Sequence, residues 1–540
     1  MKNSVLLLIV FCTLLHADTL LVPSEYPDIF SAISAAQDGD TVLVFPGHYN
    51  GGFSFQGKNI VLRSSGGASN TFIESPFSFF HCVMFTGGED STAVLEGFSI
   101  TNMDFDGKSH EGRDPVANGG GIYITNSSPT IRNNVIINCE VSEFGGGIYI
   151  MNSSSCLTEN TITDSYAHGT SGGIRAGGSS VSEQPLRIID CTISNNEAQI
   201  TGGVSITHSN AEIINNTIIN NLGLGQGAGG IGINSPSVLL ISNYISGNDG
   251  GRGGGVAISG NVSLIGNIIV ENQAGIGGGV ACYGNYLLME NNTICMNTAL
   301  SSTYGTGGLS ITQCDTAFVT NNIIWGNQAP NGTVPNILIY DTYITISYSN
   351  IGGGIDSIWI DPTSTLIWGP GNIDIDPQFE TGPLGDYHLS YGSPCIDAGN
   401  PDWEYNDPED PFNPGYALWP AMGTTRNDMG AFGGGGVNYW LTVEEEESSA
   451  PETALVLKSF PNPFSSSCTV CYQLEYPSQV NLSVFDLSGR LVETLVDEVV
   501  PAGMYSEYLY GSGLCSGIYL IRLVADEHAA SRRCVIVRDD

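Results

Sequence analysis

One pattern of hydrophobic and polar residues recurs at intervals of about 25 residues through the middle of the chain, which is typical of a repeat protein. Each repeat contains a Gly-Gly pair, a stretch of alternating apolar and polar residues, and an Asn with apolar residues before and after it. Side chains of a β-strand alternate between two faces, so the apolar residues of each stretch share one face. Isoleucine stands two residues after the Asn position in eight repeats: Ile136, Ile162, Ile193, Ile218, Ile245, Ile269, Ile294 and Ile324.

The Asn of each repeat marks a predicted corner, because a straight strand would place the apolar positions on its two sides on opposite faces. Asn tolerates left-handed backbone angles, and stacked Asn side chains can hydrogen-bond from one coil to the next. A unit this short cannot bury its apolar side alone and must stack on its neighbours. We therefore predict an all-β fold, a right-handed parallel β-helix (solenoid). The corner positions are Asn134, Asn160, Cys191, Asn216, Asn243, Asn267, Asn292 and Asn322.

The flanking sequences predict the remaining organisation. The first residues are typical of a signal peptide, since Lys2 precedes an apolar run and Ala17 is small. A helical spacing of apolar residues over 28–36 predicts a short helix that covers the open first coil. The last 85 or so residues alternate as in a small antiparallel β-sandwich. We expect a signal peptide at 1–17, an N-terminal cap and first coil at 18–50, the β-helix at 51–370, a closing segment at 371–440, an acidic linker at 441–455 and the β-sandwich at 456–540.

Charge and composition narrow the classes of function. Lys and Arg number 16 against 54 Asp and Glu, a net charge of −38, which argues against nucleic acid and anionic membranes as partners. No stretch after the signal peptide approaches the roughly 20 apolar residues of a membrane helix, so no transmembrane segment is expected. The chain has 13 cysteines, and those from Cys139 to Cys314 are interpreted as small buried hydrophobes, with disulfides as the alternative.

The first coil resembles a known family. The helical segment 28–36 and the following Gly39-Asp40-Thr41-Val42 and Pro46-Gly47-His48-Tyr49 are similar to the secreted pectin-lyase-like β-helix proteins, and the likeness covers about residues 22–435. This resemblance implies the fold rather than an activity. The Gly-Gly and Asn repeats also look like those of chlamydial polymorphic outer-membrane proteins, which implies display at a cell surface.

The C-terminal module contains a set of characteristic residues: Pro461, Asn462, Pro463, Phe464, Asp486, Gly489, Arg490, Gly503, Gly517 and Tyr519. In these residues it resembles the type A sorting domain of the type IX secretion system. The resemblance implies a Gram-negative bacterium and export across the outer membrane by the type IX secretion machinery. It also implies removal of the domain, with attachment to surface lipopolysaccharide or release, so that the protein lies at the outer-membrane surface or outside the cell.

Two sets of residues on the first three regular coils are candidates for a site. Tyr123 and Tyr149 fall at equivalent outward positions, with Arg175 on the next coil; they could hold a sugar ring and its carboxylate, or merely fill the surface. Glu159 and Asp190 are also equivalent, and carboxylates about 5 Å apart would suit a retaining glycosidase or bind calcium. A solvated pair is the alternative.

Acidic side chains gather in two further loops. Asp104 and Asp106 interrupt the repeats before the first regular coil, and Asp402, Glu404 and Asp407 belong to the closing segment. Both groups could bind Ca²⁺, although the first lacks the spacing of an EF-hand loop. A purely structural role is the alternative for the second group. Ca²⁺ is therefore a possible cofactor.

The outward positions after the Gly-Gly pairs carry a single charged residue, Arg175. This scarcity favours a non-catalytic surface protein, an adhesin, spacer or carbohydrate-binding module whose partner is a polysaccharide or a host or neighbouring-cell surface. The alternative is a calcium-dependent polysaccharide lyase or glycoside hydrolase on the first three regular coils. In that case Glu159, Asp190 and Arg175 would be the catalytic residues.

Overall fold

The structure is a computed structural model, and it divides the chain into two compact units. The first comprises Met1–Asp376 and Asp397–Tyr439, and the second Pro377–Ile396 and Trp440–Asp540. The predicted signal peptide lies outside the described residues except for Ala17. The structure describes residues 17–75, 81–102, 117–178, 184–302, 305–330, 336–382, 385–410, 414–436, 456–460, 467–474, 476–486, 490–501, 503–511, 514, 517–525 and 528–536.

The first unit begins with the expected cap. Helix α1 (Ile29–Ala35) starts where the Asp28 carboxylate accepts a hydrogen bond from the Ser31 N–H at 2.7 Å, which satisfies one of the free amides of its first turn. Its residues Ile29, Ala32 and Ile33 are buried. Strands β1 (Thr19–Val22) and β2 (Thr41–Val44) pair in parallel beside it. The helix thus covers the apolar interior of the first coil.

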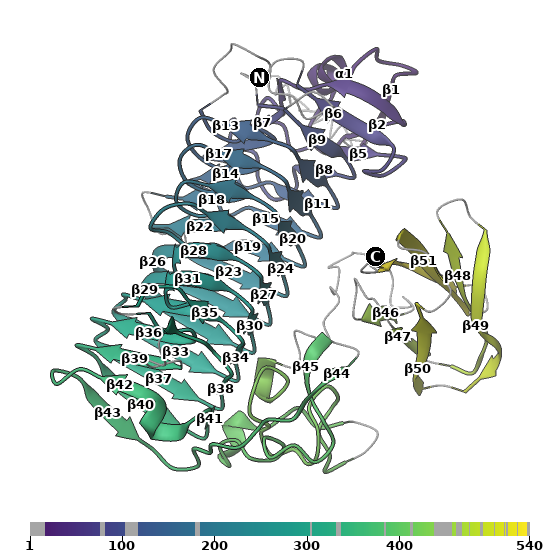
Figure 1. Ribbon diagram of the computed structural model, residues 1–540. Coiled ribbons are helices and arrows are strands. Elements are labelled where there is room, and N and C mark those ends of the chain that lie inside the picture. Colours follow the sequence, from purple (N-terminus) through teal and green to yellow (C-terminus); the bar gives the residue numbers. More distant parts are fainter. Residues whose placement is uncertain are drawn as a thin grey trace, which may run out of the picture. The chain divides into compact units, whose positions relative to one another are not determined.

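The largest sheet of the solenoid has 24 described strands, all paired in parallel (Figure 1). Two strands of each coil contribute to it, one after the Gly-Gly pair and one before the Asn corner. The first set, from the N-terminal side, is β4 (Phe53–Ser54), β7 (Val83–Phe85), β10 (Ile122–Thr125), β14 (Ile148–Met151), β18 (Ile174–Gly177), β22 (Val204–Thr207), β26 (Ile231–Ile241), β29 (Val256–Ile265), β32 (Val280–Cys282), β36 (Leu309–Thr312), β39 (Ile337–Tyr340) and β42 (Ile358–Ile360). The second set is β5 (Val61–Ser64), β8 (Val94–Glu96), β11 (Thr130–Arg132), β15 (Cys156–Thr158), β19 (Leu186–Ile189), β23 (Ala211–Ile214), β33 (Tyr286–Glu290), β37 (Thr316–Thr320), β40 (Tyr343–Ser347) and β43 (Thr365–Trp368), with β26 and β29 spanning both sets.

Two smaller sheets close each coil. The second sheet, after the Asn corner, contains β3 (Gly47–Asn50), β6 (Thr71–Glu74), β9 (Ser99–Thr101), β12 (Val135–Ile137), β16 (Thr161–Thr163), β20 (Thr192–Ser194), β24 (Thr217–Ile219), β27 (Tyr244–Ser246), β30 (Ile268–Val270), β34 (Thr293–Cys295), β38 (Ile323–Trp325) and β41 (Asn350–Ile351). The third contains β13 (Glu140–Val141), β17 (Tyr166–Ala167), β21 (Glu197–Ala198), β25 (Leu222–Gly223), β28 (Asp249–Arg252), β31 (Gln273–Ile276) and β35 (Thr298–Ala299). The predicted parallel β-helix is confirmed.

The core is a continuous stack of apolar side chains that runs from Leu20 to Ile351. All eight isoleucines that the repeat placed inward are fully buried within it. A single coil could not bury these side chains, because each shields its neighbours in the coils above and below. The inward assignment made from the two-residue alternation is therefore confirmed for this position.

The Asn corners form a ladder of buried amides. Asn243, for example, donates from Nδ2 to the Ile213 carbonyl at 2.8 Å and to Asn267 Oδ1 at 2.9 Å, and its own Oδ1 accepts the Asn216 N–H at 3.0 Å. The left-handed residue at each corner is the one before the ladder Asn, such as Asn215 or Ser242, and not the ladder Asn as expected. The Asn side chain must point into the stack to make these bonds. The residue before it therefore adopts the left-handed backbone conformation that turns the chain.

A second ladder of buried amides, not anticipated from the sequence, stands at the next corner, between the second and third sheets. Asn248 donates from Nδ2 to Asn272 Oδ1 at 2.9 Å and accepts the Asn221 N–H at 2.9 Å. The members lie five residues after those of the first ladder, a periodicity that is visible in the sequence: Asn196, Asn221, Asn248, Asn272, Asn297 and Asn327.

Cys191 interrupts the first ladder, and restoring an amide there should stabilise the solenoid. The Cys191 thiol lies 3.9 Å from Asn160 Nδ2, a weaker contact than the amide bonds elsewhere in the ladder. We expect Cys191→Asn to raise the free energy of unfolding by about 1 kcal/mol, the net worth of one added hydrogen bond. Denaturant unfolding of Cys191→Asn measures this free energy, and Cys191→Ser, which adds a polar atom without the amide, is the control. Equal unfolding midpoints of the two variants would contradict the prediction.

Residues 397–410 and 414–436 include segments that return along the outer face of the second sheet. The Ala431 N–H donates to Thr293 Oγ1 at 3.0 Å, and Ser242 Oγ donates to the Gly436 carbonyl at 2.9 Å. The outward-facing Ile268, Val270 and Ile323 are buried, and Ile323 lies against Gly430 of this segment. This return also includes the 3₁₀ turns η3 (Trp403–Tyr405) and η4 (Gly434–Gly436), while η2 (Gly354–Ser357) precedes β42. The apolar residues of this face are thus a second, lateral core.

The second unit is built from antiparallel strands. A hairpin joins β44 (Phe379–Gly382) and β45 (Gly385–Leu389). One C-terminal sheet contains β46 (Val456–Phe460), β47 (Ser467–Leu474) and β50 (Gly503–Tyr510), and the other β48 (Ser478–Asp486), β49 (Leu491–Val500), β51 (Gly517–Ala525) and β52 (His528–Ile536). Val470, Leu482 and Ile521 belong to their shared core. The small antiparallel β fold predicted for the C-terminal module is confirmed, and the predicted domain boundaries stay predictions.

Candidate functional site

The predicted Tyr123–Tyr149–Arg175 set lies on three adjacent coils in register. The two tyrosine rings stack with centroids 5.4 Å apart and an interplanar angle of 9°. His81, which the sequence did not single out, stacks on Tyr123 from the N-terminal side at 4.3 Å. The structure therefore brings the predicted residues together and extends the row by one ring.

The ring faces in this row are turned toward one another rather than toward solvent. Tyr123 is held between His81 and Tyr149, and Tyr149 is buried, which raises its pKa. Arg175 donates to the Ala176 carbonyl at 2.8 Å, and burial lowers its pKa. A sugar ring needs an open aromatic face to pack on. This geometry favours the alternative role of these residues, which is to fill and stiffen the surface.

Glu159 and Asp190 occupy the left-handed position before the Asn corner on adjacent coils, as their equivalent spacing predicted. The Glu159 N–H donates to the Ile189 carbonyl at 3.1 Å, and Asp190 Oδ1 accepts a bond from Asn215 Nδ2 at 2.6 Å. Asp190 is thus engaged by the side chain at the same corner of the next coil. This contact supports the interpretation of the pair as corner residues, and catalysis by them stays a hypothesis.

The calcium candidates are dispersed. Asp104 and Asp106 lie outside the described residues. Asp402 and Glu404 are exposed around η3, whereas Asp407 is buried. Within the described ranges, no group of three or more His, Cys, Asp or Glu side chains is arranged to hold a metal ion.

Asp407 instead pairs with Asp428 inside the returning segment. The Asp407 carboxylate accepts the N–H groups of Asp428 at 3.1 Å and Gly434 at 2.5 Å, and Asp428 accepts those of Asp397 and Met422, both at 2.7 Å. Burial, and then the charge of Asp428, raises the pKa of Asp407 to about 9; burial also raises the pKa of Asp428 to about 8. The two carboxyls tie together the loops that cover the second sheet.

This pair predicts that the first unit becomes less stable as pH rises. Both folded-state pKa values lie above the unfolded value of about 3.9, so the stabilisation is complete below about pH 4 and is lost as pH rises through about 8 to 9. We expect the Tm to fall between about pH 5 and pH 9, and Asp428→Asn to flatten the slope. Thermal unfolding monitored by circular dichroism measures both. A Tm that rises with pH in calcium buffer would instead indicate a metal ion between the carboxylates.

The last coils present an apolar face that the sequence analysis missed. Leu288, Phe318, Thr345 and Ile367 form one row across β33, β37, β40 and β43, and Tyr286 and Tyr343 stand in the neighbouring row. Tyr286, Phe318 and Tyr343 are 38%, 37% and 43% exposed. The Tyr286 and Phe318 ring centroids are 6.1 Å apart and tilted by 55°, so the rings are not closed off by stacking. We call Tyr286, Leu288, Phe318, Tyr343 and Ile367 the aromatic face.

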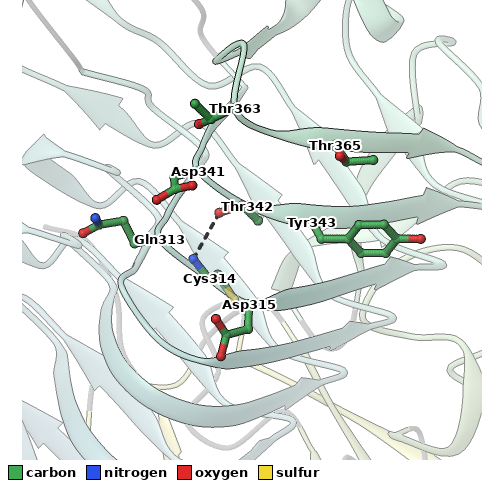
Figure 2. A pocket seen from close by; sticks show the side chains of 8 residues that line it. All are labelled: Gln313, Cys314, Asp315, Asp341, Thr342, Tyr343, Thr363 and Thr365. Atoms are coloured by element: carbon green, nitrogen blue, oxygen red, sulfur yellow. Dashed lines mark hydrogen bonds between the residues drawn. The ribbon is translucent and has the colours of Figure 1, made fainter.

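A polar hollow of about 330 Å³ adjoins the aromatic face, and Tyr343 belongs to both (Figure 2). It lies on the turns that precede β37, β40 and β43. The Cys314 N–H donates to Thr342 Oγ1 at 3.1 Å, and the Thr342 N–H to Ser364 Oγ at 3.2 Å, so each turn is fixed to the next. The exposed carboxylates of Asp315 and Asp341 lie at its rim. The remaining lining residues are Gln313, Thr363 and Thr365.

The charged side chains around the hollow are all acidic. The sequence has no Lys or Arg between Arg252 and Arg426, whereas Asp315, Asp341 and Asp361 belong to the turns around the hollow. The arrangement offers open ring faces, hydroxyls and carboxylate acceptors but no cation. These are the groups that hold an uncharged, hydroxyl-rich ligand. The face has a signal in the sequence, because Leu288 and Phe318 stand at equivalent outward positions before the Asn corner.

The sorting-motif residues divide between strands and segments outside the described residues. Asp486 ends β48, and Gly503 and Gly517 begin β50 and β51. Tyr519 is buried in β51 and Arg490 is exposed before β49. Pro461, Asn462, Pro463, Phe464 and Gly489 fall outside the described residues.

Two family models match this chain. A model described as "Right handed beta helix region" matches residues 172–342, and one described as "Secretion system C-terminal sorting domain" matches residues 458–537. Comparison with curated proteins and with solved structures found no match. The described residues include no helix with the length and apolar character of a membrane span.

Proposed function

We propose that this chain, a right-handed β-helix protein with a type IX secretion sorting tail, is a non-catalytic surface protein that binds neutral polysaccharide through the aromatic face and its polar hollow. The sorting domain directs export by the type IX secretion machinery to the cell surface or the extracellular space. The single observation that carries the proposal is the exposure of Tyr286, Phe318 and Tyr343 beside a hollow lined by hydroxyls and carboxylates.

The chemistry of a sugar chain fits this arrangement. The apolar side of a pyranose ring packs on an open aromatic face, and its hydroxyls donate to carboxylates such as those of Asp315 and Asp341. Adjacent strands of a sheet lie about 4.8 Å apart, so Phe318 and Tyr343, on strands of successive coils, present their rings along the axis of the solenoid. We therefore expect an extended chain to lie along this axis, across several coils.

The acidic residues around the hollow favour neutral over anionic polysaccharides. An anionic polymer such as polygalacturonate would approach Asp315, Asp341 and Asp361 without a described cation to offset them. Arg175, the residue expected to take a sugar carboxylate, is partly buried and lies on the first regular coils, away from the aromatic face. Neutral glycans are accordingly the favoured ligand class.

Binding without turnover is the expected mode. A general acid that works near neutral pH needs a carboxyl in an enclosed apolar environment, whereas Asp315 and Asp341 stand exposed at the rim of the hollow. The alternative, a lyase or hydrolase that uses Glu159, Asp190 and Arg175, would require substrate to reach the first three regular coils. Asp190 accepts a bond from Asn215 Nδ2 and Arg175 donates to the Ala176 carbonyl, contacts that suit a structural role.

Incubation of the purified full chain with neutral and uronic-acid polysaccharides, with and without calcium, tests the proposal. We expect retention on at least one neutral polymer, at least about tenfold weaker retention on polygalacturonate, and no reducing ends or unsaturated products. Products that disappear in Glu159→Gln or Asp190→Asn would make the protein an enzyme. Retention on no polymer would leave a spacer or a protein-binding role and would contradict the proposal.

A further inference from the structure

Two cysteines of adjacent coils meet beneath the polar hollow. Cys282 is the last residue of β32 and lies opposite Ile311 of β36 in the next coil. Cys314 follows three residues later, in the turn before β37. Both side chains are buried in the solenoid core. The register therefore brings the two thiols to the same corner of two successive coils.

Two further observations bring the thiols together. Cys314 Sγ lies 3.6 Å from the Asn285 carbonyl, in the turn that directly follows Cys282. The two thiols also interact with each other, and this interaction lowers the pKa of Cys314 and raises the pKa of Cys282. Cys314 is therefore the thiol of the pair that more readily becomes the attacking thiolate.

Two other buried cysteines of the solenoid, Cys139 and Cys191, have their sulfurs against backbone carbonyls. Cys139 Sγ contacts the carbonyls of Ile100 and Ile137, and burial raises its pKa to about 12. Cys191 Sγ likewise contacts backbone carbonyls, of Leu157 and Ile189, and burial raises its pKa to about 12. Cys139 and Cys191 match the expectation of small buried hydrophobes. Cys282 and Cys314 are equally buried, and in addition their thiols interact with each other.

We propose that Cys282 and Cys314 form a disulfide bond once the chain has left the cytoplasm. Export takes the chain into compartments where disulfides form and persist. The oxidant is a protein or small-molecule disulfide, and the bond forms by exchange. The Cys314 thiolate attacks the oxidant and releases one thiol; the Cys282 thiol loses its proton and attacks the mixed disulfide, which releases the second thiol. Two thiols and one disulfide become one disulfide and two thiols.

The disulfide would fasten two adjacent coils at the turn that carries the hollow. Cys314 lines the hollow and its N–H is bonded to Thr342, so movement of this turn would displace Asp315 and Thr342 together. A covalent link restricts the unfolded chain and opposes local opening of these coils. The consequence is a more rigid binding surface outside the cell than in the reduced chain.

Peptide mapping of the full chain, treated with oxidised glutathione and then alkylated and digested without reduction, tests the inference. We expect the peptides that contain Cys282 and Cys314 to be recovered linked, two hydrogen masses lighter than their sum, and to separate on reduction. Cys139 should be recovered alkylated. Recovery of Cys282 and Cys314 as separate alkylated peptides, or linked to other cysteines, would overturn the inference.

A stability measurement gives an independent test. Reduction should lower the Tm of the oxidised chain by a few degrees and should leave the Tm of a Cys282→Ala, Cys314→Ala double variant unchanged. Cys139→Ala is the matched control, because it removes a buried thiol and should keep the response to reductant. An equal response in the double variant would contradict the proposed pair.

Discussion

Replacing both Phe318 and Tyr343 by alanine should weaken retention on the neutral polysaccharide that the full chain binds by about 100-fold. Each ring offers an open face, and loss of one stacked ring is expected to cost about 1.4 kcal/mol, or tenfold in affinity. The single variants should each lose about tenfold if the sugar chain crosses both coils. Affinity electrophoresis or depletion on the insoluble polymer measures the change.

The two side chains are exposed, so their removal should leave the Tm unchanged and the loss can be assigned to binding. Tyr416→Ala is the matched control, because Tyr416 is 53% exposed and lies outside the aromatic face. If the double variant still binds the polymer and Tyr123→Ala does not, the binding site lies on the first regular coils and not on the aromatic face. Equal losses in the double variant and in Tyr416→Ala would show that the effect is not specific to the face.

Asn243→Ala should lower the free energy of unfolding of the solenoid by several kcal/mol, because each buried group that loses its hydrogen-bond partner costs about 1–3 kcal/mol. The Asn243 side chain donates to the Ile213 carbonyl and to Asn267 Oδ1, and it accepts a bond from the Asn216 N–H. All of these groups are buried. Its loss leaves several of these groups without a partner in a position that water does not reach. Denaturant unfolding followed by circular dichroism gives the change.

The control for Asn243 is a corner at the surface. Asn152 donates to Asn126 Oδ1 at 3.2 Å in an exposed position and has a left-handed backbone. Asn152→Gly keeps that backbone without strain and should change the free energy of unfolding by less than about 0.5 kcal/mol. A small effect of Asn243→Ala, comparable with that of Asn152→Gly, would mean that the ladder determines the register of the coils and contributes little to their stability.

The repeat could be predicted because it depends only on the spacing of residues within each coil. An inward residue of one coil meets the same position of the next, so the eight isoleucines identify the core without knowledge of distant contacts. The same regularity placed Tyr123, Tyr149 and Arg175 on adjacent coils. The sequence therefore predicted where a side chain lies along a coil, but it did not predict the role of that side chain. The rings of Tyr123 and Tyr149, for example, stack on each other and do not present open faces to a ligand.

The sequence by itself determined the solenoid, its inward positions and its C-terminal sorting domain, since each depends on spacing within a coil or on a contiguous motif. Only the tertiary structure decided which outward positions are open. Ile323 is covered by Gly430, which lies about 100 residues further along the chain and which no local period encodes, whereas Phe318 and Tyr343 are exposed. Exposure depends on what packs from outside a coil, so the candidate site emerged only once the returning segment was in place.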